Sequence, residues 1–163
     1  MNIDLGDDPL RLDRQVCFPL YAASNLISRR YRPALTPLGL TYPQYLVMLV
    51  LWEHTPQTVG SLGEALYLDS GTLTPLLKRM EQAGLIRRAR DPMDERRVLV
   101  ALTRRGASLR SKALGVPQTL AQGFSGDPSS LVDLREMVRT LLSTLADHGD
   151  PSMDRVKRRS QEN

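Results

Sequence analysis

The chain has 163 residues, and its composition excludes several classes of protein before any motif is considered. No apolar run approaches the roughly 20 residues of a membrane-spanning helix, and the acidic N-terminus lacks the basic and apolar regions of a signal peptide. The single cysteine, Cys17, excludes an intramolecular disulfide and a cysteine-rich metal site. We therefore expect a cytosolic domain with no metal, no cofactor and no membrane partner. Its formal charge of +4 favours a polyanionic partner.

The N-terminal part predicts a flexible arm and then a helix. Residues 1–9 are polar and acidic, and a helical pattern follows over residues 10–36 with Asp13 as a candidate N-cap. Pro19 would cost roughly 3 kcal/mol in the interior of a helix. We therefore expect the regular helix to start near Val16, which leaves Pro19 in its first turn. The apolar strip consists of Val16, Leu20, Ala23, Ile27 and Tyr31.

Cys17 lies in the first turn of this helix if the helix starts late. The partial positive charge of a helix start stabilises an anion, which favours a reactive cysteine. A lone cysteine on a helix is nevertheless more often a buried small residue than a reactive one. Tyr21 and Tyr31 fall on the same helical face as Cys17, one turn and several turns away. The residues alone leave both interpretations open.

The next segment predicts a core helix. Thr41 is its N-cap, and Pro43 lies near its start, where proline is tolerated. Residues 45–52 are apolar on nearly every side, as expected of a helix enclosed by others. Three residues that disfavour a helix separate it from the first one: Pro33, Pro37 and Gly39.

Two further helices are joined so tightly that they predict a helix-turn-helix. Residues 58–67 form the first, with Thr58 as its cap, and residues 69–83 form the second, with Pro75 within about the first turn and Gly84 as the stop. The expected inward residues are Val59, Leu62, Ala65, Leu66, Leu73, Leu76, Leu77 and Met80. The opposite face of the second helix is expected to enter the DNA major groove, and it presents Ser70, Thr72, Thr74, Lys78 and Arg79.

An arginine-rich hairpin follows and predicts a wing that reaches an adjacent minor groove. Its strands are expected at residues 85–90 and 97–102, with a turn over residues 91–96. Arg96 is the best candidate for minor-groove contact, and Asp94 is expected to orient it. Arg97 is either a DNA contact or a structural ion-pair residue. The wing residues predicted to bind DNA are Arg88, Arg90, Asp94, Arg96 and Arg97.

The C-terminal part predicts two more helices and a tail. Thr103 caps a helix over residues 104–122 with a bend at Pro117, and a last helix starts at Asp127 or Ser129. Residues 149–163 predict a disordered basic tail. The apolar residues expected on these helices are Ala107, Leu109, Leu114 and Leu120, then Leu131, Leu134, Met137, Val138, Leu141, Leu142 and Leu145.

The fold class predicted from these elements is mainly α with a small β-hairpin wing. A winged helix-turn-helix occupies about residues 58–103, and dimerisation helices flank it over about residues 10–36 and 104–148. The apolar strip of the last helix needs a partner, and the simplest one is a second copy of the chain. A two-fold homodimer would read a palindromic site on double-stranded DNA with its two recognition helices.

The order of these elements resembles the MarR family of dimeric regulators. The resemblance covers roughly residues 10–145, within a domain expected over residues 10–148. Three stretches are more specific: LDRQVCF at 12–18, LTYPQYLVMLVLWE at 40–53 and LYLDSGTLTPLLKR at 66–79. Together with DERR at 94–97 they resemble the organic hydroperoxide resistance regulators of that family, of the one-cysteine type.

That resemblance implies a repressor whose reactive cysteine, matched by Cys17, is oxidised by organic hydroperoxides to a sulfenic acid. Two tyrosines that hydrogen-bond this cysteine from the partner subunit are matched by Tyr31 and Tyr42, and a third pocket tyrosine is matched by Tyr21. With no second cysteine, the sulfenic acid would react with a low-molecular-weight thiol or oxidise further. Pro19 beside the sensor departs from the pattern of the group.

Three other functions compete with this hypothesis. The chain could be a repressor that releases DNA when a small phenolic or aromatic ligand binds, with Cys17 inert. It could be a peroxide-consuming enzyme, although it has no Cys-x-x-Cys pair and no catalytic histidine or cofactor motif. A structural helical scaffold would leave the arginine-rich wing unexplained. We therefore expect a regulator and not an enzyme.

Overall fold

The computed structural model describes residue 8, residues 10–121 and residues 128–147. The predicted tail at 149–163 and all of the predicted arm except Asp8 lie outside these residues. Two short 3₁₀ helices, η1 and η2, accompany seven α-helices and three strands in the described chain. In order they are η1 (Leu12–Arg14), α1 (Cys17–Leu35), η2 (Thr36–Leu38), α2 (Tyr42–Glu53), β1 (Gln57–Thr58), α3 (Val59–Leu66), α4 (Ser70–Gln82), β2 (Ile86–Asp91), β3 (Asp94–Leu102), α5 (Arg104–Lys112), α6 (Gln118–Ala121) and α7 (Pro128–Asp147).

The first long helix starts late, as Pro19 predicts. Cys17 is the first residue of α1 and Pro19 the third, so the proline costs no internal hydrogen bond. The prediction of Asp13 as its N-cap is wrong, because Asp13 belongs to η1 and bonds Arg11 at 2.9 Å. Pro33 does not end the helix either. It lies inside the last turn of α1, where it removes only one hydrogen bond.

The second helix, α2, forms the centre of the core. Thr41 and Gln44 make the reciprocal capping box at its start, as the predicted cap requires. Within the described chain no single helix is long and apolar enough to cross a membrane. Only the pair of segments Cys17–Leu38 and Tyr42–Glu53, bent by 67°, reaches that length and composition together. The side chains of α2 that are buried in the core are Tyr45, Val47, Met48 and Leu51.

The helix-turn-helix consists of α3 and α4, each with a side-chain cap. Thr58 accepts a hydrogen bond from the backbone N–H of Ser61 at 3.0 Å, and Asp69 accepts one from Thr72 at 2.9 Å. All four inward residues predicted on α4 are buried. Ala65 of α3, however, is exposed, and Pro75 is the sixth residue of α4, one turn deeper than expected.

The hairpin is longer, and its turn tighter, than the sequence suggested. Strands β2 and β3 pair antiparallel and are joined by only Pro92 and Met93, so the expected turn over residues 91–96 is wrong. Residues 94–96 belong to β3 because Asp94 pairs with Asp91 and extends the ladder. The two-residue strand β1 adds to the other edge of β3, giving the order β1-β3-β2. Such a short strand has too little periodicity to be predicted.

The C-terminal helices differ most from the prediction. The expected helix 104–122 is divided into α5 and α6 by a turn that contains Gly115 and Pro117. Ala107 and Leu114, expected as apolar positions of this helix, are exposed, whereas Leu109 is buried. Thr103 is the cap of α5, accepting from the N–H of Gly106 at 3.0 Å. The side chain of Leu120 lies outside the described part of the structure.

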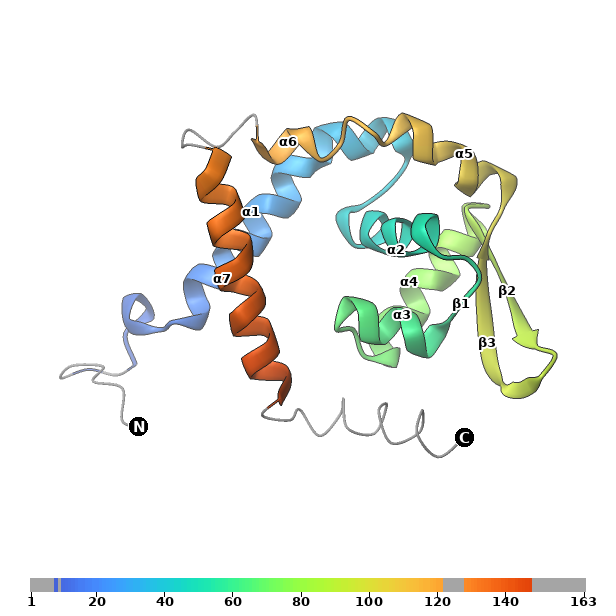
Figure 1. The fold of residues 1–163 in the computed structure, drawn as a ribbon, viewed down its shortest axis with the longest axis horizontal. Helices are drawn as coiled ribbons and strands as arrows, with labels where there is room; N and C mark the ends of the chain where they lie inside the picture. The colour runs from blue at the N-terminus through green and yellow to red at the C-terminus, as the bar shows by residue number, and fades with distance from the viewer. Residues whose placement is uncertain (1–7, 9, 122–127, 148–163) are drawn as a thin grey trace.

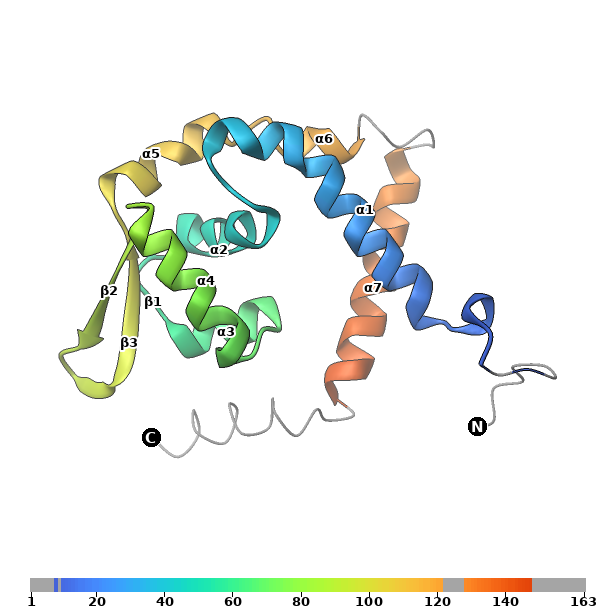
Figure 2. The ribbon, with the colours of Figure 1, turned by 180° about the vertical axis from the view of Figure 1, so that it is seen from behind.

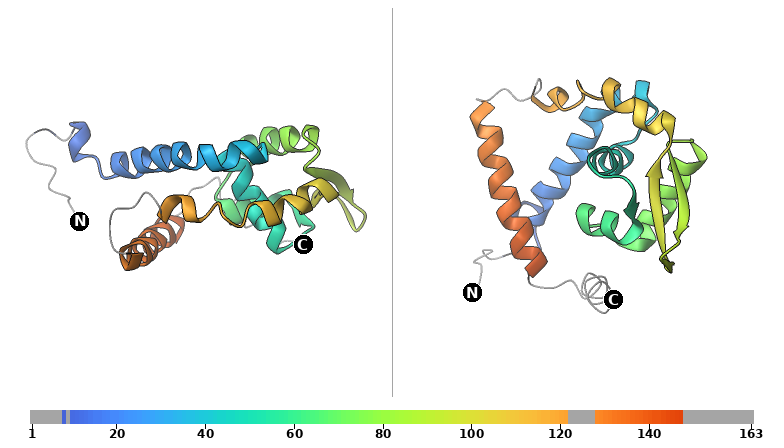
Figure 3. Two further views of the ribbon diagram at one scale, coloured as in Figure 1. Left: turned by 90° about the horizontal axis from the view of Figure 1, so that it is seen from above. Right: turned by 45° about the vertical axis from the view of Figure 1, so that its right-hand side comes forward.

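Two parts of the molecule can be followed in Figure 1. The elements α2, α3, α4 and the sheet pack together, while α1 extends away from them and α6 lies against α1. The view from above in Figure 3 shows α7 standing apart from α1. The apolar side chains of α7 are therefore exposed, namely Val132, Leu134, Met137, Val138, Leu142 and Leu145.

Gly106 makes the close approach of α5 to the hairpin base possible. A Cβ at this position would collide with the backbone carbonyl oxygen of Leu85 and come within 3.3 Å of the Leu102 side chain. The Gly106 carbonyl also accepts the indole N–H of Trp52 at 3.0 Å. Any side chain at residue 106 must therefore move α5 away from both α2 and the sheet.

We predict that Gly106→Ala lowers the free energy of unfolding by about 1–3 kcal/mol, the usual cost of overpacking. Gly115→Ala is the matched control, because a Cβ at Gly115 meets nothing within 4 Å. Urea unfolding followed by the fluorescence of Trp52, the single tryptophan, measures both changes at one fixed protein concentration. Equal midpoints for the two variants would contradict this assignment.

Candidate functional site

The exposed face of α4 carries the residues predicted to read DNA. The buried side chains Leu73 and Leu77 fix the rotation of the helix, and the other side faces solvent. Figure 2 shows α4 in front of α2 and α3, so this face is not covered by another element. All five predicted residues are exposed on α4: Ser70, Thr72, Thr74, Lys78 and Arg79.

The start of α4 is fixed by a carboxylate. Asp69 accepts the backbone N–H of Thr72 with one oxygen and the Thr72 hydroxyl with the other, both at 2.9 Å. These bonds, first the backbone one, lower the pKa of Asp69. The first turn of α4 is therefore held in place without DNA, with the side chain of Thr72 bonded to Asp69.

The hairpin tip is organised around Asp94. Its carboxylate accepts from Arg97 Nε at 3.0 Å and from the backbone N–H and Nε of Arg96 at 3.1 and 3.2 Å. The Arg97 bond and then the Arg96 bonds lower the pKa of Asp94 to about 2. Because the folded-state pKa is depressed, these bonds persist above about pH 4 and weaken only as the pH falls toward about 2.

The two arginines at this tip differ in exposure. The Arg96 side chain is 76% exposed and the Arg97 side chain 51%, while Asp94 between them is only 15% exposed. Arg97 thus forms an ion pair with Asp94, which is one of the two roles that the sequence predicted for it. Asp94 also contacts Arg96, whose side chain is the more exposed of the two.

The base of the hairpin is tied to the end of α4. Glu81 accepts the backbone N–H of Arg88 at 2.8 Å, its Nε at 2.9 Å and its Nη2 at 2.8 Å. The side-chain bond from Arg88 is the main cause that lowers the pKa of Glu81. Arg88 therefore links β2 to α4, and a DNA contact from it stays a prediction. Arg90, two residues nearer the tip, is exposed.

The predicted sensor cysteine lies at the opposite end of the molecule from the hairpin. Cys17 is the first residue of α1 and is exposed. It is therefore not a buried small residue, which is the more frequent case for a lone cysteine on a helix. The residues around it are also exposed although they are apolar. Val16, Phe18, Leu20 and Tyr21 have exposed fractions of 66%, 37%, 41% and 68%.

Tyr31 and Tyr42, two of the predicted pocket tyrosines, meet within one chain. Their ring centroids are 5.1 Å apart, and Tyr45 joins them at 6.2 and 6.5 Å. Burial raises the pKa of all three phenols, which keeps them protonated as hydrogen-bond donors. Sequence reasoning missed Tyr45 because it treated the residue as core, although its spacing of three from Tyr42 places both on one helical face.

The chain does not bring these tyrosines to its own cysteine. Cys17 and Tyr31 lie fourteen residues apart on one continuous helix, α1. At 1.5 Å per residue that separation is about 21 Å along the helix axis. Tyr21, one turn from Cys17, is the only one of the three predicted tyrosines near it. A pocket that combines the thiol with Tyr31 and Tyr42 therefore requires a second molecule.

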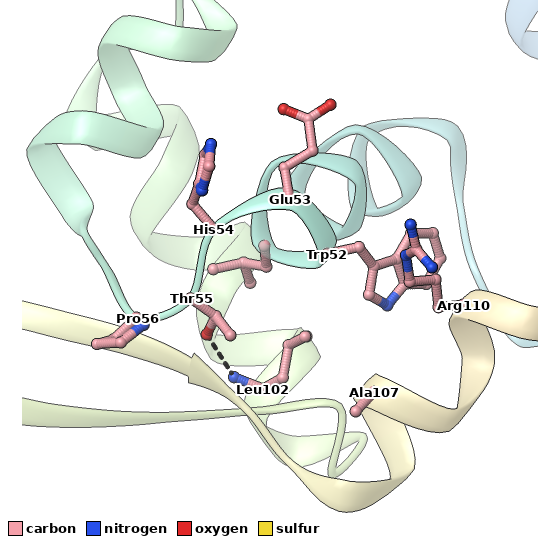
Figure 4. A pocket seen from close by; sticks show the side chains of 9 residues that line it. Trp52, Glu53, His54, Thr55, Pro56, Leu102, Ala107 and Arg110 are labelled. Atoms are coloured by element: carbon pink, nitrogen blue, oxygen red, sulfur yellow. Dashed lines mark hydrogen bonds between the residues drawn. The ribbon is translucent and has the colours of Figure 1, made fainter.

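Two cavities lie away from the cysteine. One, of about 520 Å³, lies between the end of α1 and the start of α2 and is lined in part by Arg29, Arg32 and Tyr42. The other, of about 450 Å³, lies between α2, β3 and α5 (Figure 4). One of its polar groups is bonded within the chain, since the Thr55 hydroxyl accepts the backbone N–H of Leu102 at 3.2 Å. No group of three residues suited to hold a metal occurs in the described chain.

Comparison with known proteins identifies the family. Residues 40–98 match the model of the MarR family. The organic hydroperoxide resistance transcriptional regulator of Bacillus subtilis is 51% identical over 138 residues, which are 85% of this chain and 94% of that protein. The HTH-type transcriptional regulator TtmR of Methylorubrum extorquens is 49% identical over 144 residues, which are 88% of this chain and 70% of that protein.

A solved structure supports the same conclusion. Reduced AbfR bound to DNA has a TM-score of 0.72 and 35% identity, and the match covers 86% of this chain and 96% of that one. The fold class is thereby confirmed as mainly helical with a small antiparallel wing. The names of the relatives describe transcriptional regulators and not enzymes. Because the Bacillus subtilis regulator is 51% identical and is matched over 94% of its length, the chain belongs to the MarR family and is a transcriptional regulator.

Proposed function

We propose that this chain is a cytosolic, homodimeric repressor that releases its operator when an organic hydroperoxide oxidises Cys17. The observation that carries the proposal is the exposure of Cys17 at the first residue of α1, within an exposed apolar segment. The 51% identity to a regulator named for organic hydroperoxide resistance supports this signal. The active unit is the whole segment 10–148, with residues 58–103 as the DNA reader.

The exposed apolar surfaces support the dimer. Leu12, Val16 and Leu20 near the start of α1 are exposed, as are the apolar residues of α7. Leaving such a surface in water is unfavourable by about 25 cal/mol per Å². A second copy would cover both segments and bring its Tyr31 and Tyr42 to the Cys17 of the first. The winged modules of the two copies would then engage two half-sites of a palindrome.

The sensing chemistry uses the sulfur as a nucleophile. The thiolate of Cys17 attacks the terminal oxygen of the hydroperoxide, the O–O bond breaks, and the alkoxide leaves as an alcohol after taking a proton. The product is a sulfenic acid, with sulfur oxidised by two electrons. A low-molecular-weight thiol then forms a mixed disulfide and releases water. Tyr21, Tyr31 and Tyr42 are proposed to donate hydrogen bonds to the anionic sulfur, and apolar walls favour organic peroxides.

Release of DNA follows from the position of the cysteine between the subunits. A polar oxygen, and later a bulky adduct, no longer fits an apolar seam, so the two copies change their relative position. The spacing of the two α4 helices then departs from one helical turn of DNA, and affinity falls. The proposed contacts are Ser70, Thr72, Thr74, Lys78 and Arg79 from α4 and Arg88, Arg90, Arg96 and Arg97 from the wing, with Asp94 orienting Arg96.

Removal of the minor-groove arginine tests the wing. Arg96→Ala should weaken binding of an operator duplex by about 1–3 kcal/mol, because a groove contact is lost in addition to one positive charge. Arg110→Ala is the charge-matched control, since Arg110 is exposed on α5 and is not assigned to DNA. Fluorescence anisotropy at one salt concentration measures both variants. An equal loss of operator affinity in the two variants would show that Arg96 contributes only its positive charge and no specific groove contact.

Gel shifts of the DNA upstream of the gene test the signal. The reduced protein should bind, and stoichiometric tert-butyl hydroperoxide should release it. Cys17→Ser should bind and stay bound after the same treatment. Release of Cys17→Ser at that dose, or retention of the native protein after its sulfenic acid has been trapped, would refute the redox switch.

A second candidate signal is a small phenolic or aromatic ligand, with Cys17 inert. The cavity of about 520 Å³ supports it, because Tyr42 offers a ring face and Arg29 and Arg32 offer positive charge. An acidic aromatic ligand would fit this chemistry. Under this alternative, sodium salicylate as the probe should release DNA equally from the native protein and from Cys17→Ser, and peroxide should release neither.

A further inference from the structure

The thioether at the end of the hairpin is exposed to an unusual degree. Met93 is 93% exposed, more than any other large apolar side chain in the described chain. It is the second residue of the two-residue turn between β2 and β3. The ribbon in Figure 1 shows this turn projecting beyond the packed helices. A large apolar side chain that is exposed at this position does not stabilise the fold, because it buries almost no apolar surface.

The turn is held so that Met93 stays at the tip. The carboxylate of Asp91 accepts the backbone N–H of Met93 at 2.9 Å, and that of Asp94 accepts the backbone N–H of Arg96 at 3.1 Å. Both bonds fix the backbone on either side of the side chain. The thioether is therefore presented three residues from Arg96, the arginine proposed to enter the minor groove.

We propose that Met93 is a second oxidation site, at which conversion to the sulfoxide weakens operator binding independently of Cys17. This inference rests on the proposed DNA-binding function of the wing. The oxidant class is the organic hydroperoxide. A sulfur lone pair attacks the terminal oxygen, the O–O bond breaks, the proton of the hydroperoxide passes to the departing alkoxide, and the products are one sulfoxide and one alcohol.

Exposure makes this methionine the preferred target within the described chain. Met48 and Met80 are fully buried in the core and out of reach of an oxidant in solution. Met137, on α7, is 70% exposed and is the competing site. In the proposed dimer, however, α7 is covered by the second copy, while the hairpin tip stays open. DNA-free protein should therefore add oxygen first at Met93.

A methionine sulfoxide interacts less favourably with DNA than a methionine does. A methionine side chain can lie in the minor groove as an apolar contact. Its sulfoxide is polar and adds an oxygen that only accepts hydrogen bonds. The floor of an A·T minor groove presents acceptors, and the phosphates beside it are anionic. Oxidation thus replaces an apolar contact by a group with no donor for these partners.

The experiment uses the full chain with Cys17→Ser, so that no sulfenic acid can form. Three proteins are compared: this one, the same with Met93→Leu and the same with Met137→Leu. Each is treated with excess tert-butyl hydroperoxide, its oxidised peptides are identified by mass spectrometry, and its affinity for the operator duplex is measured before and after. Leucine keeps the apolar volume but has no sulfur.

We expect one added oxygen on Met93 and an affinity about tenfold lower, comparable to the loss of one groove contact. Methionine sulfoxide reductase should restore binding, and the Met137→Leu protein should behave in the same way. The Met93→Leu protein should keep its own starting affinity after treatment. A fourth protein, Cys17→Ser with Met93→Gln, carries a polar group without any oxidant and should bind more weakly than the untreated Met93→Leu protein.

Three results would overturn the inference: Met137 oxidised while Met93 is not, Met93 sulfoxide with unchanged affinity, or an equal loss in the Met93→Leu protein. Failure of the untreated native protein to bind any operator would overturn the proposed function together with this inference. That outcome is seen before oxidant is added, so it is distinguishable from the others.

Discussion

The length of one uninterrupted helix determines where the proposed sensor residues can lie. Because α1 runs without a break from Cys17 to Leu35, the thiol and the tyrosine cluster at its other end are held about 21 Å apart. In the proposed sensing mechanism, one end supplies an exposed sulfur and the other supplies phenols that stay protonated. Neither end forms a complete site in a single molecule. A two-fold partner that lies antiparallel along α1 would resolve this separation, since it places each end beside the opposite end of its neighbour.

The winged module, by contrast, is complete within one chain. Glu81 joins the end of α4 to β2 through Arg88. At the tip of the hairpin, Asp94 accepts hydrogen bonds from Arg96 and Arg97. Gly106 lets α5 pack directly on Leu85 at the base of the hairpin. These bonds make α4 and the wing one body, so a shift at the dimer seam moves both DNA-reading elements together. Coupling between sensor and reader then depends on the relative position of the two copies, and deformation inside the module is not required.

The sequence predicted the parts whose pattern is local. The rotation of α4, its caps, the late start of α1 and the arginine-rich hairpin all follow from periodicity, proline geometry and capping chemistry, and the structure agrees. The sequence did not predict strand β1, which depends on long-range pairing with β3, or the tight Pro92-Met93 turn. It predicted a bend at Pro117 but not two separate helices, α5 and α6. Ala107 and Leu114 were expected as apolar positions of one helix, but both are exposed, and Leu114 lies in the turn that separates α5 from α6. Sensor residues were named from resemblance, since a contact between two molecules leaves no spacing signal in one chain.

A mixed dimer tests directly whether the second copy completes the sensor. One subunit carries Cys17→Ser and the other carries both Tyr31→Phe and Tyr42→Phe, so each dimer, purified through two different tags, contains one cysteine. The rate of sulfenic acid formation with tert-butyl hydroperoxide is measured by dimedone trapping. We expect the native rate per cysteine, because the remaining thiol faces the intact tyrosines of the other copy. A rate as slow as that of the dimer in which both subunits lack the two phenols would contradict this expectation.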